Sequence, residues 1–170
     1  MLTKGREGGQ ALVEFALVAP IFLLILFGII QLGLLFAGQN GLTSAVRETA
    51  RYAAPYLVVD STGAQTTCAT VAQSLVDLLG GNPLTADPSS NRTFPLVTYS
   101  TLTDPSGNSY LEVTVKAEYK FPLYVPLVGN FLDGMDGVSD SNLRISAQEE
   151  MRVENDTTGI TTTGFPVSCS

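Results

Sequence analysis

The chain has 170 residues, a formal net charge of −7 at neutral pH and a charged fraction of 15%. This length allows one modest domain besides a membrane segment, and the acidic balance argues against nucleic acid, whose phosphates require a basic face. Histidine is absent, which excludes His-based acid–base catalysis, His-containing catalytic triads and His metal ligands.

The first predicted element is an apolar helix near the N-terminus. Residues 15–37, FALVAPIFLLILFGIIQLGLLFA, carry no charge, and Gln31 is the only strongly polar residue among them. A helix of this length spans roughly 35 Å, enough to cross about 30 Å of hydrocarbon with some tilt. A cleaved secretory signal, the main alternative, has an apolar region of only about 7 to 15 residues. The sequence therefore predicts a transmembrane helix, which Pro20 should kink or loosen because it lacks a backbone donor.

The flanking charges predict the orientation of this helix. Lys4, Arg6 and the terminal amine precede the span, and basic residues beside a span favour the cytoplasmic side. From Gly38 onward there are seven Lys or Arg against fourteen Asp or Glu. We therefore expect a single-pass protein with its N-terminus in the cytoplasm and its body outside.

The helix is expected to continue beyond the membrane as a stalk, to about Ala54. Arg47 and Arg51 share one face of it, four residues apart, and Glu48 is within reach of Arg51 or Tyr52. This arginine pair is either a contact for a partner protein or a solvated face that meets lipid headgroups. Another face has apolar residues at helical spacing and should be buried: Leu42, Val46, Thr49 or Ala50, and Ala53. Pro55 should end the helix.

A second, amphipathic helix is predicted within residues 66–82, TTCATVAQSLVDLLGGN. Its apolar face comprises Val71, Leu75, Leu78 and Leu79, and Gly80 with Gly81 supplies the stop. This segment contains Cys68, and the only other cysteine is Cys169. Two cysteines so far apart do not form a CxxC-type zinc site. They form either a disulfide, if this part lies outside the cytoplasm, or two free thiols.

A β-hairpin is predicted next, with strands at residues 93–103 and 110–121 around the turn-forming sequence DPSGNS. The second strand alternates strictly: one face carries Leu111, Val113, Val115, Ala117, Tyr119 and Phe121, and the other carries Glu112, Thr114, Lys116, Glu118 and Lys120. A period of two indicates a half-buried antiparallel strand. Residues 142–153, NLRISAQEEMRV, suggest a third strand with weaker alternation. A helix packed on a small antiparallel sheet gives an α+β fold.

The loop before the third strand, DGMDGVSD, carries three acids that could ligate calcium: Asp133, Asp136 and Asp140. Their spacing lacks the D-x-[DN]-x-[DN]-G pattern and its closing Glu, so a plain acidic loop is the favoured interpretation and no metal is expected. The polar, Thr-rich residues 155–170 should form a mobile end unless Cys169 tethers them.

One acid, Glu14, interrupts the start of the apolar run. Counting from Gly9, the pattern is G-x-x-x-x-E-F, followed at once by the apolar helix. It resembles the processing site of prepilins, in which a peptidase cuts after the glycine. A cut there would make Gln10 the new N-terminus and place Glu14 one helical turn from the freed amine. In a membrane or fibre, that acid could neutralise the amine of a neighbouring subunit at low dielectric.

A longer block, Gly9 to Ala54, resembles the TadE family of tight-adherence pilus assembly proteins, which are pseudopilin-like. The resemblance rests on G-x-x-x-x-E-F, ALVAP, FGIIQLG and AVRETARYAA in chain order. A looser likeness covers Val113 to Glu154, through VTVKAEYKFPLYVPLVGNF and LRISAQEEMRVE.

The resemblance implies a pseudopilin or minor pilin that is needed to assemble a tight-adherence pilus. Its implied partners are a prepilin peptidase, other pilins or pseudopilins, an inner-membrane assembly platform and lipid. The implied sites are Gly9 and Gln10 for processing and Glu14 and Phe15 for assembly. No cofactor, no nucleic acid and no enzymatic activity are expected. An unprocessed single-pass accessory protein of a secretion or signalling system is the alternative, and a membrane-held enzyme has no candidate catalytic group.

Together these expectations give a pilin-like layout, in which a small sheet leans on the aqueous half of a long N-terminal helix. The predicted parts are a cytoplasmic leader (1–9), a transmembrane helix (10–37), a helical stalk (38–56), an extracytoplasmic α+β domain (57–154) and a polar tail (155–170).

Overall fold

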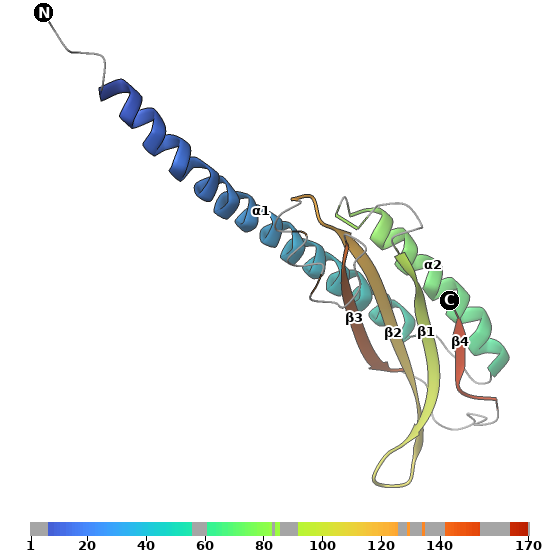
Figure 1. The fold of residues 1–170 in the computed structure, drawn as a ribbon. Helices are drawn as coiled ribbons and strands as arrows, with labels where there is room; N and C mark the ends of the chain where they lie inside the picture. The colour runs from blue at the N-terminus through green and yellow to red at the C-terminus, as the bar shows by residue number, and fades with distance from the viewer. Residues whose placement is uncertain are drawn as a thin grey trace, which may run out of the picture. The chain divides into compact units, whose positions relative to one another are not determined.

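The computed structural model describes residues 7–55, 61–82, 84–85, 92–125, 129, 134, 142–153 and 164–169. Within them lie two helices and four strands, in the order α1, α2, β1, β2, β3, β4 (Figure 1). The chain divides into two compact units. One comprises Met1–Leu35 and Pro122–Leu143, and the other comprises Phe36–Phe121 and Arg144–Ser170. The fold is α+β with a pilin-like layout, as predicted.

The helix α1 spans Glu7–Ala53, 47 residues, and contributes to both units. It was expected from about Ala11 to Ala54, so the single long helix is confirmed. The helix continues through Pro20, because the neighbouring turns still supply most of the backbone hydrogen bonds that a proline removes. Pro55 lies two residues beyond the last helical residue, in agreement with its predicted role as a stop.

The sheet has the strand order β3-β2-β1-β4. Strand β1 (Arg92–Thr103) pairs antiparallel with β2 (Ser109–Pro122), and β4 (Val167–Cys169) pairs antiparallel with β1. Strand β3 (Asn142–Arg152) lies on the other side of β2. The predicted hairpin and third strand are confirmed. Strand β4 was not foreseen, since its three residues fall in the polar tail that was expected to be mobile unless Cys169 tethered it.

The hairpin loop has the turn chemistry that its sequence predicts. The Asp104 carboxylate accepts hydrogen bonds from the backbone N–H groups of Ser106 and Asn108, at 2.9 and 2.8 Å. These bonds, with that from Asn108 first, hold the pKa of Asp104 below its usual value. Gly107 adopts a φ of 86°, which residues with a side chain rarely adopt.

One face of the sheet forms the core of the second unit. The alternation predicted for β2 is confirmed, because its six apolar residues from Leu111 to Phe121 are buried and the intervening residues are part-exposed. Val97 and Tyr99 of β1 pair with Val115 and Val113 and continue the same buried face.

Helix α2 (Ser61–Gly80) packs against β1 and β4. Its buried stripe consists of Ala64, Cys68, Val71, Ala72, Leu75 and Leu79. Leu78, which was predicted to share this face, is 42% exposed, so that prediction was wrong. Leu78 and Leu79 both neighbour Leu75 on the helix surface, and the direction in which the helix docks decides which of them is covered.

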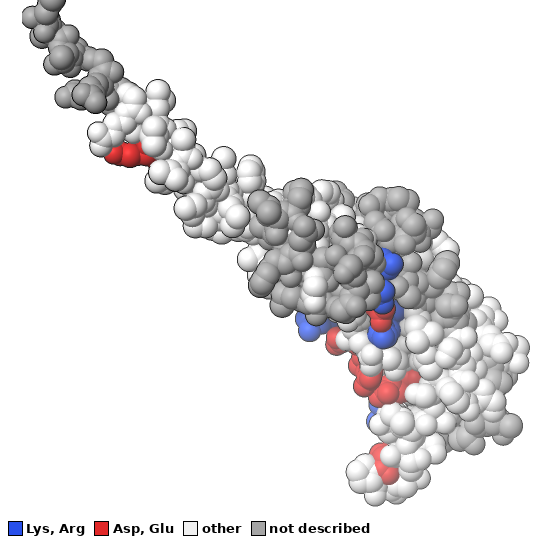
Figure 2. Space-filling view, in the orientation of Figure 1, with Lys and Arg blue, Asp and Glu red and all other residues white. Residues whose placement is uncertain are grey.

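The C-terminal part of α1 packs on the sheet of the same unit. The residues predicted to form its buried face are all buried: Leu42, Val46, Thr49, Ala50 and Ala53. At Gly38, a side chain would meet Phe121 of β2 and Ile145 of β3, so glycine allows close approach of the helix to the sheet. The opposite face of the sheet stays open to solvent, and acidic and basic side chains gather there over β2 and β3 (Figure 2).

Candidate functional site

The predicted processing and assembly residues lie together at the start of α1. Gly9 is helical and exposed, with nothing within 4 Å of the position a Cβ would take. Gln10 Nε2 donates a hydrogen bond to Glu14 Oε1 at 3.0 Å. Phe15 is exposed. The bond between Gly9 and Gln10 lies in the first described turn of α1, which begins at Glu7, and helix ends fray most readily.

The helix beyond Glu14 exposes its apolar side chains on every side. From Leu12 to Ile30 nearly all large apolar residues are exposed, among them Leu17, Ile21, Phe22 and Phe27. In the part of the chain that the structure describes, α1 is the one helix that is long and apolar enough to cross a membrane. Figure 2 shows an acidic group near the beginning of this helix, where Glu14 is the only acid between Gly9 and Arg47 in the sequence. An apolar surface of this size requires a lipid or protein partner.

Gln31 directly follows Leu12–Ile30, the bare stretch, and is 1% exposed, whereas Leu32 and Phe36 beyond it are again 40% and 65% exposed. Its Oε1 accepts a hydrogen bond from the backbone N–H of Tyr124 at 3.1 Å, whereas its Nε2 is buried and has no hydrogen-bond partner among the described residues. Sequence reasoning noted Gln31 as the polar residue of the span but did not connect it with Tyr124. The signal available in the sequence was a lone amide in a long apolar segment, where a polar side chain typically makes a specific contact.

The structure separates the two arginines that were predicted as a pair. Arg47 Nε lies 3.4 Å from Glu149 Oε2 of β3, and Arg51 Nη2 lies 3.0 Å from Glu48 Oε2 on the same helix. The predicted contact between Glu48 and Arg51 is therefore present. Both guanidinium groups remain largely exposed, with side-chain exposures of 66% and 73%, so each ion pair contributes little stability and leaves the arginine accessible.

The surroundings of Cys68 bear on the predicted disulfide. Cys68 is fully buried, and its Sγ lies 3.5 Å from the carbonyl oxygen of Val97 in β1. Val97 is also the residue that pairs with Cys169 in β4. There is no free cysteine among the described residues. The two cysteines, 101 positions apart, are thus brought to the same strand, β1.

The open face of the sheet carries the remaining charged groups. Burial raises the pKa of Glu112, and the neighbouring Glu150 carboxylate raises it further. Lys116 Nζ and Glu118 Oε1 form an ion pair at 2.8 Å, and the Arg152 guanidinium lies 4.8 Å from the centre of the Tyr110 ring. Within the described ranges, no group of three Cys, Asp or Glu residues could hold a metal ion. The acidic loop with Asp133, Asp136 and Asp140 lies outside those ranges.

Comparison with known proteins agrees with the resemblance read from the N-terminal block. A family model described as TadE-like protein matches residues 9–51, a segment that includes the processing pattern, the bare apolar stretch and both arginines. No curated protein and no solved structure matches the chain. The matched residues lie wholly within α1, so the match concerns this helix and not the sheet.

Proposed function

Since the segment 9–51 is TadE-like, we propose that this protein is a pseudopilin, or minor pilin, needed to assemble a tight-adherence pilus. It acts through helix-mediated assembly in the membrane, without catalysis. The observation that carries this proposal is the apolar surface of α1, which is exposed from Leu12 to Ile30 and carries one acid, Glu14, near its start. A surface of this kind is suited to lipid before assembly and to the helices of neighbouring subunits after it.

Processing after Gly9 would give Glu14 its electrostatic role. In the intact chain the carboxylate accepts a hydrogen bond from the Gln10 side chain. Removal of the leader would free an ammonium group at Gln10, one helical turn away. In a bundle of apolar helices, the carboxylate of one subunit would then attract the ammonium of the next, because opposite charges interact strongly at low dielectric. Phe15 would lie at the same helix–helix contact.

The proposal includes a membrane topology and a set of partners. The leader lies in the cytoplasm, α1 crosses the inner membrane once, and the sheet lies outside the cytoplasm. The partners are a prepilin peptidase, other pilins or pseudopilins, the assembly platform and lipid. Arg47 and Arg51 are proposed to contact such a partner protein, which their exposure permits.

We further propose that Cys68 and Cys169 form a disulfide. Cys169 pairs through its backbone with Val97, whose carbonyl oxygen is next to the Cys68 sulfur. Its formation outside the cytoplasm would release two protons and two electrons from the thiols to a thiol-oxidising protein disulfide. The bridge would fasten the short strand β4 to α2.

Two experiments on cells that make the pilus test the main proposal. Mass spectrometry of the membrane fraction should find a mature chain that begins at Gln10. Glu14→Ala should leave membrane insertion intact and abolish surface filaments, whereas Asp77→Ala, which removes an exposed acid from α2, should leave filaments unchanged. Normal filament output from Glu14→Ala would overturn the electrostatic role of this acid.

The alternative function is an unprocessed single-pass accessory protein of a secretion or signalling system. The helical conformation of Gly9 favours it, since the bond that a peptidase would cut lies inside α1. A chain that still begins at Met1 in filament-producing cells would support this alternative.

A further inference from the structure

The turn after β2 packs against the apolar helix at Gln31. The chain leaves β2 at Pro122, and the backbone N–H of Tyr124 donates to Gln31 Oε1. Gly129 N–H donates to the carbonyl oxygen of Val125, and a side chain at Gly129 would lie 3.2 Å from Leu123 Cβ. The described part of this segment therefore forms a turn. The hydrogen bond from Tyr124 N–H to the buried Gln31 side chain connects this turn to α1.

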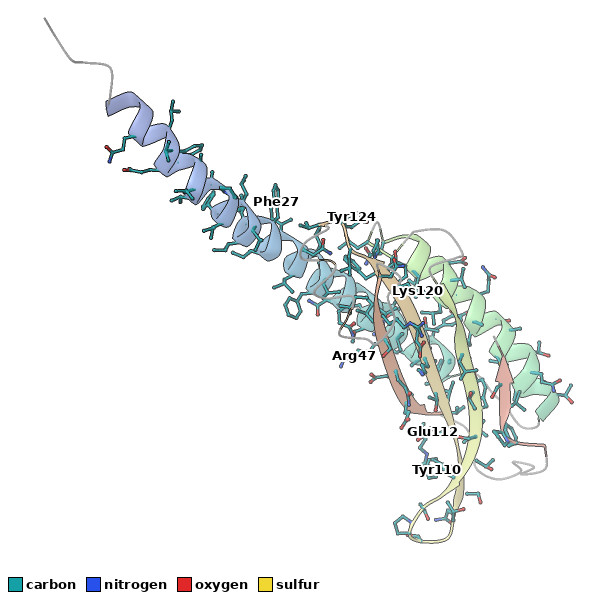
Figure 3. All side chains as sticks on the ribbon, viewed as in Figure 1. Phe27, Arg47, Tyr110, Glu112, Lys120 and Tyr124 are labelled. Atoms are coloured by element: carbon teal, nitrogen blue, oxygen red, sulfur yellow. The ribbon has the colours of Figure 1, made fainter. Side chains whose placement is uncertain are left out.

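The exposed side chain of this turn is aromatic and amphipathic. The Tyr124 side chain is among the exposed large apolar groups, at 66%, and it is flanked by Leu123 and Val125, which are half-buried. Figure 3 shows Tyr124 near the part of α1 from which Phe27 projects, and both residues belong to the same compact unit. Tyrosine is enriched where hydrocarbon meets headgroups, because its ring is apolar and its hydroxyl is polar.

The length of the bare stretch places this turn at a membrane boundary. Leu12 to Ile30 covers 19 residues, which as a helix spans roughly 28 Å, close to the thickness of the hydrocarbon core. Gln31 is the next residue and is buried, and from there the protein covers one side of its helix, while Leu32 and Phe36 on other sides stay exposed. Without the Gln31 side chain, the Tyr124 N–H would lose its hydrogen-bond acceptor at a depth where little water is present to replace it, and this loss would destabilise the turn.

We propose that the turn Leu123–Val125 is a second membrane contact, which docks on the extracytoplasmic headgroup interface of the bilayer that α1 crosses. Tyr124 lies at that interface as an anchor, and Gln31 holds the turn there through the Tyr124 backbone. Lipid is the occupant because the turn is continuous with the bare apolar surface of the helix. This inference rests on the proposed membrane span, and it adds a specific lipid-facing residue outside that span.

The chain has no tryptophan, so single tryptophans can report the depth of chosen positions. Three variants of the full-length chain are reconstituted into vesicles of phosphatidylethanolamine and phosphatidylglycerol that contain lipids brominated at shallow or deep acyl positions. Tyr124→Trp tests the turn, and Phe27→Trp marks the span. Tyr110→Trp, beside the charged groups of Glu112 and Arg152, marks the sheet.

Tyr124→Trp should show a blue-shifted emission and lose more intensity with shallow than with deep bromine. Phe27→Trp should lose more intensity with deep bromine, and Tyr110→Trp should be unaffected by either. Emission from Tyr124→Trp that matches Tyr110→Trp would overturn this inference while Phe27→Trp still supports the membrane span. A blue shift at position 124 without quenching would also overturn it, because that result would indicate a protein contact. Failure of Phe27→Trp to be quenched would instead overturn the span itself.

Discussion

The two halves of α1 belong to one continuous helix but have opposite surroundings. Between Leu12 and Ile30 nearly all large apolar side chains are exposed around the whole circumference, whereas between Leu42 and Ala53 one stripe is buried and the rest is polar. The second half finds its partners within the chain, on the sheet and at Asn82, just beyond α2. The first half does not, among the residues that the structure describes. A helix that is apolar on all sides is suited to an apolar solvent, and one with a single apolar stripe is suited to the boundary between a core and water.

The largest expected contrast comes from truncating one leucine in each half. Leu42→Ala should lower the free energy of unfolding by about 2–5 kcal/mol, because Leu42 is fully buried and its loss leaves a cavity. Leu24→Ala should change it by less than about 0.5 kcal/mol, because Leu24 is exposed within the chain. Denaturant unfolding in detergent micelles, followed by circular dichroism, measures both. Equal losses would show that the two halves are not packed differently.

A second contrast concerns the proposed disulfide, which would crosslink only the unit that contains the sheet. If Cys68 and Cys169 are bridged, reduction should destabilise that unit by about 2–5 kcal/mol. The bare half of α1 should keep its membrane association. The matched control is the double variant Cys68→Ala with Cys169→Ala, whose stability should not respond to reductant. A wild-type protein equally insensitive to reductant would contradict the bridge.

The boundary between the halves can be tested through two glutamines of α1. Gln31 accepts a hydrogen bond from Tyr124 N–H, and Gln39 Nε2 donates to the carbonyl oxygen of Ser146 in β3. Gln31→Leu should speed hydrogen exchange at the Tyr124 amide by roughly 2- to 10-fold, since the bond is worth about 0.5–1.5 kcal/mol. Gln39→Leu should leave that amide unchanged. Exchange measured by NMR that is equal in both variants would show that Gln31 does not hold the turn.

The smallest effect is expected on the open sheet face, which neither half of α1 covers. Burial and Glu150 raise the pKa of Glu112, so its ionised form disfavours the folded state. Glu112→Gln should therefore stabilise the fold at neutral pH by about 0.2–1 kcal/mol. The gain should disappear as the pH falls through the raised pKa to below about 4, where Glu112 is protonated in both states.

Glu118→Gln is the control for this effect, because Glu118 pairs with Lys116. It should be neutral or slightly destabilising at neutral pH. Thermal unfolding at several pH values compares the two variants, and the same sign of change in both would contradict the repulsion between Glu112 and Glu150.

Elements with a strong periodic pattern were predictable from the sequence. The apolar run, the stripe from Leu42 to Ala53 and the alternation of β2 each reflect one periodicity of the backbone, so the side chains on one face are fixed once the element forms. The processing pattern around Gly9 and Glu14 was likewise visible, since it is local in sequence.

Elements that depend on distant contacts were not predictable. Strand β4 has three residues and no periodic signal, and it forms because the edge of β1 offers unpaired backbone groups. Leu78 and Leu79 were equivalent in the pattern, and docking buried only Leu79. The contact of Gln31 with Tyr124 joins residues 93 positions apart.

The sequence by itself determined that this protein has a long helix with an apolar half and an amphipathic half, followed by an α+β body, because hydrophobicity and its period act locally along the chain. Only the tertiary structure decided where the helix stops being bare, which strand closes the edge of β1, and which polar group of the span has a partner. Those features depend on contacts between backbone and side-chain groups that are far apart in the sequence and come together only when the chain folds. No local sequence pattern encodes such contacts.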